Sequence, residues 1–327
     1  MSERFLSFYA LGVRQLSFAV SRIARECKRV VGTALWLIAF SLPYSSSAGE
    51  VVLINQPLSD TDPRYTYIYE LLSLVLETTT ATHGSLELQQ APMVISRDRT
   101  LVSLIAGNSI HVMAEAPKPN WDENLLPVEI PIRKGLQGFR VFIIHSRNES
   151  RLASVNSFDE LINLPTGSGA QWSTRKAMEL AGFNVVTSPS YKGLFGMLSA
   201  NRFVTFSRGI NEAYREVNAH KSGYPGLVVD DQFLLHIPLP TYFYVTPTRP
   251  KLARRIRLGL LQLMASGEFD RFFYRYHCDD LVRSNMSKRR VFRIENPLLE
   301  ERGSLEESAN WIDPTTDYES LCRAMNL

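Results

Sequence analysis

The sequence is poor in the residues that metal sites and redox chemistry use. Three of its 327 residues are cysteine and six are histidine. No Cys-x-x-Cys pair occurs and no cysteine and histidine stand at metal-ligand spacing, so we expect no metal and no cofactor. No His-Glu-x-x-His motif and no Gly-x-Ser-x-Gly elbow occurs either. We therefore expect a protein that is not an enzyme, with an envelope hydrolase as the less favoured alternative.

A large excess of one charge is missing too. The chain holds 36 basic and 33 acidic residues, a net charge of +3. Residues 1–48 contain six of the basic and two of the acidic residues, which leaves 30 basic and 31 acidic residues in the remainder, a net charge of −1. A nearly neutral body gives no support for nucleic-acid binding, so no nucleic-acid partner is expected.

Long apolar runs are absent after residue 48. The run before it, Val30–Leu42, is 13 uncharged residues long, short of the roughly 20 that a membrane-spanning helix needs. Arg22–Arg29 holds four basic residues ahead of it, Pro43 interrupts it, and Ser45–Ala48 offers small residues for cleavage. These features predict a secretory signal peptide over residues 1–48 or, without cleavage, an N-terminal anchor, and they place the remainder in the periplasm.

Two cysteines, Cys278 and Cys322, remain after residue 48. An oxidising compartment would permit a disulfide between them. Sequence does not show how far apart they lie, so a bridge and two separate thiols both stay open.

Short apolar runs alternate with amphipathic segments after residue 48. Val51–Asn55, Leu86–Gln90 and Ile110–Ala114 have the pattern of strands, and Tyr65–Thr79 and Arg97–Ala106 that of helices between them. This strand–helix order predicts a parallel sheet with helices on its faces.

A second series of the same kind follows, and the chain then returns. Phe139–His145 has the pattern of a strand that leaves the first unit, Phe233–Leu239 that of a returning strand, and Pro250–Ala265 that of a long helix. Residues 269–276 add an aromatic helical segment, expected in the core.

This order predicts an α/β protein of two lobes, each a mostly parallel sheet flanked by helices. Lobe 1 is expected to comprise residues 49–140 and 237–285, and lobe 2 residues 141–236. Residues 286–327 are expected to form a charged C-terminal extension on the surface. The two passages between the lobes would make a hinge, and the cleft between the lobes is the default ligand site.

The arrangement resembles the type II periplasmic binding proteins, in particular the extracellular solute-binding family of amino-acid ABC transporters. The segments that carry the resemblance are Val51–Asn55, Arg99–Met113, Gly138–Ser146, Ser157–Trp172, Val204–Ala213, Pro240–Pro247 and Leu252–Phe273. The resemblance implies a monomeric exported protein that captures a small solute and presents it to an ABC permease or a membrane sensor.

One turn departs from the family pattern. Amino-acid-binding members typically place an acidic residue after a strand of the second lobe, whereas this chain has Ser207, Arg208 and Gly209 there. A basic residue at this turn implies an anionic or zwitterionic solute. It also leaves open a sensor or signalling subunit whose cleft is degenerate.

Candidate ligand-binding residues follow from the rule that ligands of open α/β sheets bind beyond the carboxyl ends of the strands. In lobe 1 the candidates are Tyr65, Arg97, Glu115, Trp121 and Arg133. In lobe 2 they are Gly167, Ser168, Gly169, Gln171, Trp172, Tyr191, Ser207 and Arg208.

Each candidate has an alternative interpretation. Thr166–Gln171 is expected to be a Gly/Ser loop whose backbone N–H groups approach a ligand, or an ordinary loop. Arg208 is expected to clamp an anion, or to pair with Glu212 one helical turn away. The aromatic candidates would line the cleft or pack in the core.

Overall fold

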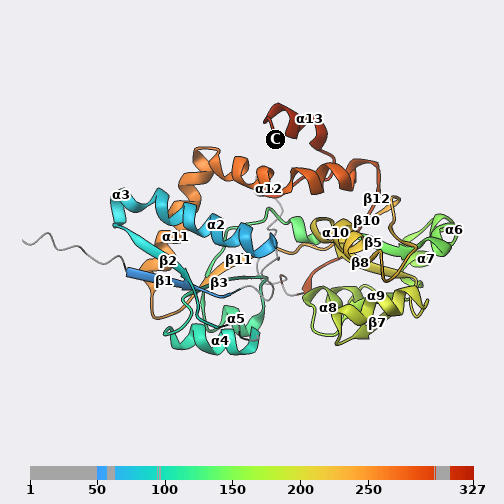
Figure 1. The fold of residues 1–327 in the computed structure, drawn as a ribbon, viewed down its shortest axis with the longest axis horizontal. Helices are drawn as coiled ribbons and strands as arrows, with labels where there is room; N and C mark the ends of the chain where they lie inside the picture. The colour runs from blue at the N-terminus through green and yellow to red at the C-terminus, as the bar shows by residue number, and fades with distance from the viewer. Residues whose placement is uncertain (1–49, 57–62, 94, 96, 298, 300–309) are drawn as a thin grey trace, which may run out of the picture. The chain divides into compact units, whose positions relative to one another are not determined.

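The structure, a computed structural model, describes residues 50–56, 63–93, 95, 97–297, 299 and 310–327. The predicted signal segment, residues 1–48, lies outside the described residues. Within the described part, no helix combines the length and the apolar character that crossing a bilayer would require. Two sheets, each flanked by helices, make up this part of the chain (Figure 1).

The first sheet has five strands in the order β2-β1-β3-β11-β4. The strands are β1 (Glu50–Ile54), β2 (Leu86–Gln90), β3 (Val112–Glu115), β4 (Leu126–Val128) and β11 (Tyr242–Val245). β1 runs parallel to β2 and β3, while β11 is antiparallel to β3 and β4 because it belongs to the returning chain. The predicted strand–helix–strand series thus forms one sheet.

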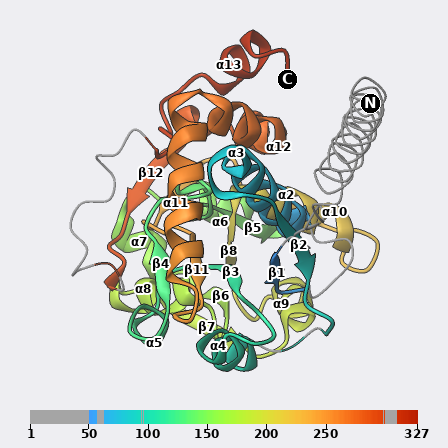
Figure 2. The ribbon, with the colours of Figure 1, turned by 90° about the vertical axis from the view of Figure 1, so that its left-hand side faces the viewer.

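Helices of the first sheet include α2 (Pro63–Thr78), α3 (Thr80–His83), α4 (Arg97–Ala106), α5 (Pro119–Asp122) and α11 (Pro250–Ala265). α2 and α11 pack against each other (Figure 2). Gly259 allows this approach, because a Cβ there would lie 2.5 Å from the backbone oxygen of Val75. Arg255, buried in the same contact, donates to the hydroxyl of Thr79 at 2.7 Å.

The second sheet has seven strands, with β12-β10-β5-β8-β6-β7 in order and β9 paired to β5. Its strands are β5 (Phe139–His145), β6 (Thr166–Gly169), β7 (Val185–Ser188), β8 (Thr205–Gly209), β9 (Leu227–Val229), β10 (Phe233–His236) and β12 (Arg290–Arg293). Its helices are α6 (Glu149–Ala153), α7 (Phe158–Ile162), α8 (Ser173–Leu180), α9 (Tyr191–Ser199) and α10 (Ile210–His220). The prediction of two sheets flanked by helices is confirmed.

The predicted loop over Thr166–Gln171 is wrong, because its first four residues form the buried strand β6. β6 lies between β7 and β8 and is parallel to both. Its glycines leave room for aromatic rings: a Cβ at Gly167 would overlap the ring of Phe203, and one at Gly169 would overlap the indole of Trp172. The small residues therefore serve packing inside a sheet.

Two passages between the sheets lie beside the segments predicted from sequence and hydrogen bond to each other, and a third passage was not predicted. Crossing 1, residues 129–138, leads from β4 to β5, and crossing 2, residues 237–241, leads from β10 to β11. The backbone N–H of Ile132 donates to the oxygen of Thr241 at 3.0 Å, and that of Ile237 donates to the oxygen of Gly138 at 2.9 Å. The two crossings thus form one double-stranded connection.

A third connection runs through α12 (Glu268–Ser284). Near its middle, Phe272 and His277 pack on Tyr67 of α2, with ring centroids 5.3 and 5.0 Å away. Further on, Asp280 accepts from Arg215 of α10 at 2.8 Å. Residues 285–289, here crossing 3, then lead into β12, which pairs with β10 of the second sheet. α12 therefore contacts helices of both sheets.

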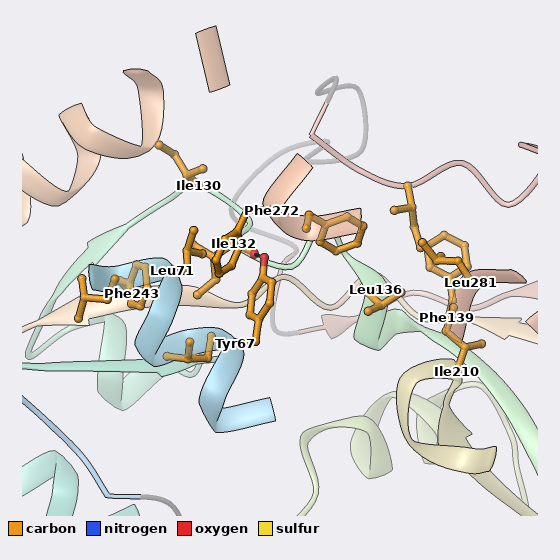
Figure 3. Packing of buried hydrophobic residues seen from close by; sticks show 14 of the residues in the cluster. Tyr67, Leu71, Ile130, Ile132, Leu136, Phe139, Ile210, Phe243, Phe272 and Leu281 are labelled. Carbon is orange, nitrogen blue, oxygen red and sulfur yellow. Dashed lines mark hydrogen bonds between the residues drawn. The ribbon is translucent and has the colours of Figure 1, made fainter. Parts of the chain in front are cut away.

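One apolar core cluster extends through this junction (Figure 3). It includes Tyr67 and Leu71 of α2, Ile132 and Leu136 of crossing 1, and Phe139 of β5. The hydroxyl of Tyr67 donates to the backbone oxygen of Ile132 at 2.5 Å, which ties α2 to crossing 1. The junction is therefore packed as a protein interior is.

The predicted C-terminal extension, residues 286–327, is neither confined to the surface nor separate from the lobes, because β12 within it is a strand of the second sheet. Ile312, Tyr318 and Cys322 are buried, and α13 (Tyr318–Ala324) packs on α12 (Figure 2). Cys278 and Cys322 form a disulfide with Cα atoms 5.9 Å apart, which decides the question that the sequence left open. The expected surface location is wrong for these residues because isolated apolar side chains in a charged segment still reach the core.

Candidate functional site

Four of the predicted residues of the second sheet come together at the carboxyl ends of its strands. Ser207 and Arg208 lie on β8, Trp172 follows β6 and precedes α8, and Tyr191 opens α9 after β7. The Arg208 guanidinium carbon lies 4.4 Å from the ring centroid of Trp172 and 5.8 Å from that of Tyr191. We name these residues, together with Glu212 and Glu216, the Arg208 cluster.

Arg208 is buried in an ion-pair network, with 5% of its surface exposed. Its Nε donates to Oε2 of Glu216 at 2.6 Å, and its Nη2 donates to Oε1 of the same residue at 2.5 Å. Nη2 also lies 3.1 Å from Oε2 of Glu212. Burial alone would lower the pKa of Arg208, but the two carboxylates outweigh it and raise that pKa.

The alternative pairing of Arg208 with Glu212 is therefore present, and Glu216 extends it. Sequence reasoning missed Glu216, although it stands on the same face of α10 as Glu212, four residues further on. Any solute that contacts the Arg208 guanidinium therefore contacts a group that already forms a bidentate ion pair with Glu216. Its direct contact with a ligand stays a prediction.

A second buried arginine lies beside this network. Nε of Arg140, on β5, donates to Oγ of Ser207 at 3.0 Å, and its Nη2 donates to the backbone oxygen of Ser207 at 2.8 Å. Burial, assisted by the nearby charge of Arg208, lowers the pKa of Arg140 to about 10. Arg140 was not a candidate from sequence. Together with Arg208 it balances the two glutamates, so the formal charges of this group cancel.

Tyr191 is the accessible side of the Arg208 cluster, with 41% of its surface exposed. Burial of the remainder and the carboxylate of Glu216, which hydrogen bonds to the hydroxyl, raise the pKa of Tyr191. Trp172 is half-buried and stacks on Phe206 with a centroid distance of 5.9 Å. Two aromatic rings thus flank a salt-bridged guanidinium, an arrangement able to contact a planar or apolar part of a solute.

The remaining candidates of this sheet fall into two groups. Gly167, Ser168 and Gly169 are buried in β6, with Ser168 Oγ donating to the oxygen of Gly169 at 3.4 Å. Gln171 is exposed at the turn before α8. A backbone role of β6 toward a ligand stays a prediction, since its glycines are already explained by the rings packed on them.

In the first sheet, two candidates lie near the carboxyl ends of β1 and β3. Tyr65 donates from its hydroxyl to the backbone oxygen of Asn55, the residue after β1. Glu115, at the end of β3, accepts from the N–H of Ala116 at 3.0 Å and lies 3.5 Å from Nζ of Lys118. These contacts place polar groups at the carboxyl ends of parallel strands, as predicted.

Trp121 packs in the core of the first sheet. Only 3% of its surface is exposed, and its ring meets that of Tyr244 edge-on with centroids 5.5 Å apart. Lys118 lies over the same ring, 5.6 Å from its centroid. These contacts support a packing role for Trp121 in the core. A contact between Trp121 and a ligand stays a prediction.

Arg133 lies in crossing 1, inside the junction core. Its guanidinium carbon is 4.9 Å from the ring centroid of Tyr67. Burial lowers the pKa of the neighbouring His277 to about 4, and the charge of Arg133 acts in the same direction. Arg97 begins α4, but its side chain lies outside the described residues.

Two cavities in the described residues lie elsewhere. One of about 440 Å³ is lined by residues that include Ile144, Glu149 and Asp230. Another of about 550 Å³ lies beside the disulfide, between α12 and α13. No candidate residue lines either cavity, so the interlobe cleft stays a prediction.

No family model matches the sequence, and no curated protein matches it. Among solved structures, an ancestral arginine-binding protein bound to arginine has a TM-score of 0.50 at 13% identity, with 69% of this chain and 97% of that chain covered. An arginine-specific periplasmic binding protein of Salmonella typhimurium has a TM-score of 0.46 at 13% identity, covering 68% and 97%. A protein of glutathione import in Streptococcus mutans has a TM-score of 0.47 at 11% identity, covering 70% and 95%.

The likeness to the ancestral arginine-binding protein shows the fold of this chain, although the sequence identity is low. The two sheets described above are consistent with that fold. This chain has the two-lobed α/β fold of the type II periplasmic binding proteins.

Proposed function

We propose that this protein is an exported, monomeric solute-binding protein of the periplasm. It captures a small polar solute, zwitterionic or anionic, between its lobes and presents the solute to an ABC permease or a membrane sensor without transforming it. The fold supports this proposal, as does the description of a structural neighbour as an arginine-binding protein solved with arginine bound.

The Arg208 cluster is the observation that carries the proposal. It gathers a guanidinium, two carboxylates and two aromatic rings at the carboxyl ends of parallel strands, where ligands of open α/β sheets bind. Because the charges of Arg208 and Arg140 are balanced by Glu212 and Glu216, a solute with charges of both signs fits this surface better than a simple anion. An α-amino acid is the smallest solute of that kind.

The solute contacts we propose are divided between the lobes. In the second lobe Tyr191 and Trp172 line the solute, while Glu216 or Glu212 accepts from its ammonium group. In the first lobe Lys118, beside Glu115, holds its carboxylate. Contacts on both lobes favour the closed arrangement by the difference between the affinities of the closed and open forms.

A thermal-shift screen of the full chain against amino acids, organic acids and polyamines tests this function. A solute at 100 times its Kd stabilises the folded state by about 2.7 kcal/mol, which such a screen detects. We expect α-amino acids to raise the melting temperature. Stabilisation by polyamines alone would contradict the charge assignment, and conversion of a stabilising solute into a product would contradict the binding role.

The guanidinium of Arg208 is already bound by carboxylates of the protein, and this favours a second candidate function. In that case the protein is a sensor or signalling subunit with a degenerate cleft. Both nitrogens of Arg208 that face α10 already hold carboxylates, as they would in a purely structural network. This candidate predicts that no solute in the screen shifts the melting temperature, and that the protein acts through contact with a membrane partner.

A further inference from the structure

The last described segment of the chain, residues 310–327, lies directly on crossing 1. The backbone N–H of Ile312 donates to the backbone oxygen of Lys134 at 3.0 Å. The ring of Trp311 lies against Gly135 so closely that a Cβ at that glycine would overlap it. Lys134 and Gly135 both have positive φ, of 47° and 70°, so the segment binds the crossing where its backbone is left-handed.

The same turn is held from a second direction. The side chain of Lys134 is 4% exposed. Its Nζ donates to Oδ1 of Asp270 on α12 at 2.7 Å. Its backbone oxygen thus holds the C-terminal segment while its ammonium group holds α12. A change of backbone angles at Lys134 would disturb both contacts.

The far end of residues 310–327 is fixed as well. The disulfide joins Cys322 of α13 to Cys278 of α12. Between the two ends, Tyr318 is buried and its hydroxyl donates to the backbone oxygen of Asp313 at 2.8 Å. Ile312 belongs to the same apolar cluster as Leu136 of crossing 1. The segment is therefore attached covalently to α12 and non-covalently to the hinge.

Hinges move through backbone rotation at a few residues between rigid elements. Lys134 and Gly135 stand between β4 of the first sheet and β5 of the second, and a non-glycine residue with positive φ is uncommon. An element bonded to these residues changes how freely they rotate. Such an element shifts the equilibrium between open and closed lobes by the difference between its contact free energies in the two forms.

We propose that residues 310–327 form a strap that restrains crossing 1 and sets the equilibrium between open and closed lobes. The proposal rests on the proposed function insofar as solute capture needs the lobes to move. The strap acts in the protein without solute, because its contacts with Lys134 and Gly135 involve no candidate ligand-binding residue.

Hydrogen–deuterium exchange of the full chain without solute tests the restraint. The variant Trp311→Ala removes the ring from Gly135, and Arg323→Ala, which removes the exposed ion pair with Glu319 on α13, is the matched control. We expect exchange in residues 129–138 to be about fivefold faster or more in Trp311→Ala, as expected for loss of a contact of about 1 kcal/mol, and unchanged in Arg323→Ala. Faster exchange limited to residues 310–327 would overturn the proposal.

Lobe movement is measured separately by single-molecule energy transfer. Dyes attached through azide-bearing residues replace Ala81 of α3 and Lys176 of α8, both exposed, so that no cysteine is labelled. The strap predicts a broader distribution of dye distances in Trp311→Ala than in the parent chain. An unchanged distribution beside faster exchange would show that the segment protects the turn without controlling the lobes, which also overturns the proposal.

If Trp311→Ala accelerates exchange throughout β5 as well, a second variant tests whether residues 310–327 restrain crossing 1. The double variant Cys278→Ser/Cys322→Ser leaves Trp311 in place and removes only the far attachment. We expect it to broaden the distance distribution too, and a distribution identical to that of the parent chain would refute the strap. A screen in which no solute stabilises the protein would refute the proposed function alone, because both strap measurements are made without solute.

Discussion

Arg208 and Glu216 form a bidentate ion pair, with Nε 2.6 Å from Oε2 and Nη2 2.5 Å from Oε1. The pair joins β8 to the second turn of α10, and almost all of Arg208 is buried. A ligand that contacts this guanidinium therefore contacts a positive charge that the carboxylate of Glu216 already neutralises. The pair also links the candidate site to the stability of the second sheet.

Removing both partners of the pair is expected to destabilise the protein by less than the two single changes added together. Glu216→Gln leaves Arg208 with Glu212 alone, and Arg208→Gln leaves two carboxylates together. Breaking a buried pair typically costs about 3–5 kcal/mol. We expect Arg208→Gln to lower the free energy of unfolding by about 3 kcal/mol, and the double variant to lower it by less than the sum of the single effects.

Denaturant unfolding of the parent, the two single variants and the double variant checks this expectation as a double-mutant cycle. Arg175→Gln, which removes an exposed ion pair with Glu179 on α8, is the control and should change stability by less than about 1 kcal/mol. Additive effects of Arg208→Gln and Glu216→Gln would mean that the pair contributes no coupling.

Trp172 is expected to contribute to solute binding through its ring. Trp172→Leu keeps an apolar side chain near Gly169 but removes the aromatic face beside Arg208. An aromatic contact contributes about 1 kcal/mol beyond its area, so we expect Kd for a stabilising amino acid to rise about fivefold. Titration calorimetry of the full chain measures this, with the exposed Lys176→Ala on α8, the helix that follows Trp172, as control. An unchanged Kd would remove Trp172 from the site.

Much of the fold could be predicted from sequence where apolar runs are continuous. β5 and β10 are strands buried on both faces, and their runs of apolar residues indicate this directly. β6 could not be recognised in this way, because Thr166–Gly169 contains no apolar side chain. Its strand character comes from its neighbours β7 and β8 and from the rings of Phe203 and Trp172 that fill the space beside its glycines.

The location of the candidate site could be predicted from the sequence better than the contacts among its side chains. Sequence placed Tyr191 and Arg208 after two strands and Trp172 after a loop that is in fact β6, and parallel pairing brings the ends of these strands to one edge. It did not predict that Arg140 would bind Ser207 across the sheet, because a partner 67 residues away leaves no local pattern. The contact of Trp311 with crossing 1 was missed for the same reason.

Loss of the disulfide is expected to destabilise the protein markedly. Cys278 and Cys322 are separated by 44 residues in sequence, and the chain-entropy estimate for a loop of this length is about 4 kcal/mol. We expect Cys278→Ser/Cys322→Ser to lower the free energy of unfolding by up to this amount without loss of the fold. Denaturant unfolding of the double variant against the parent, compared with the parent in reductant, measures the effect. A difference below about 1 kcal/mol would mean that the constraint stabilises little.

Buried histidines are expected to make the protein sensitive to acid. Burial lowers the pKa of His277 to about 4, and it lowers that of His236 to about 4 as well. Because a lowered pKa means that the unfolded chain binds the proton first, their stabilisation is complete above pH 6.5 and is lost as the pH falls toward 4. Asp230 has the opposite effect: burial raises its pKa to about 6, so its contribution is complete below about pH 4 and is lost as the pH rises through 6.

The histidine effect can be isolated by replacing His277, which packs between the rings of Tyr67 and Phe273. In His277→Phe the apolar contacts remain while the titrating group is gone, so we expect the loss of unfolding free energy between pH 6.5 and 4 to be smaller by up to about 3 kcal/mol. His83→Phe, at the exposed end of α3, is the matched control and should follow the parent curve. Parallel curves for His277→Phe and the parent would show that His277 takes up its proton equally in the folded and unfolded states, because only a difference in proton binding makes stability depend on pH.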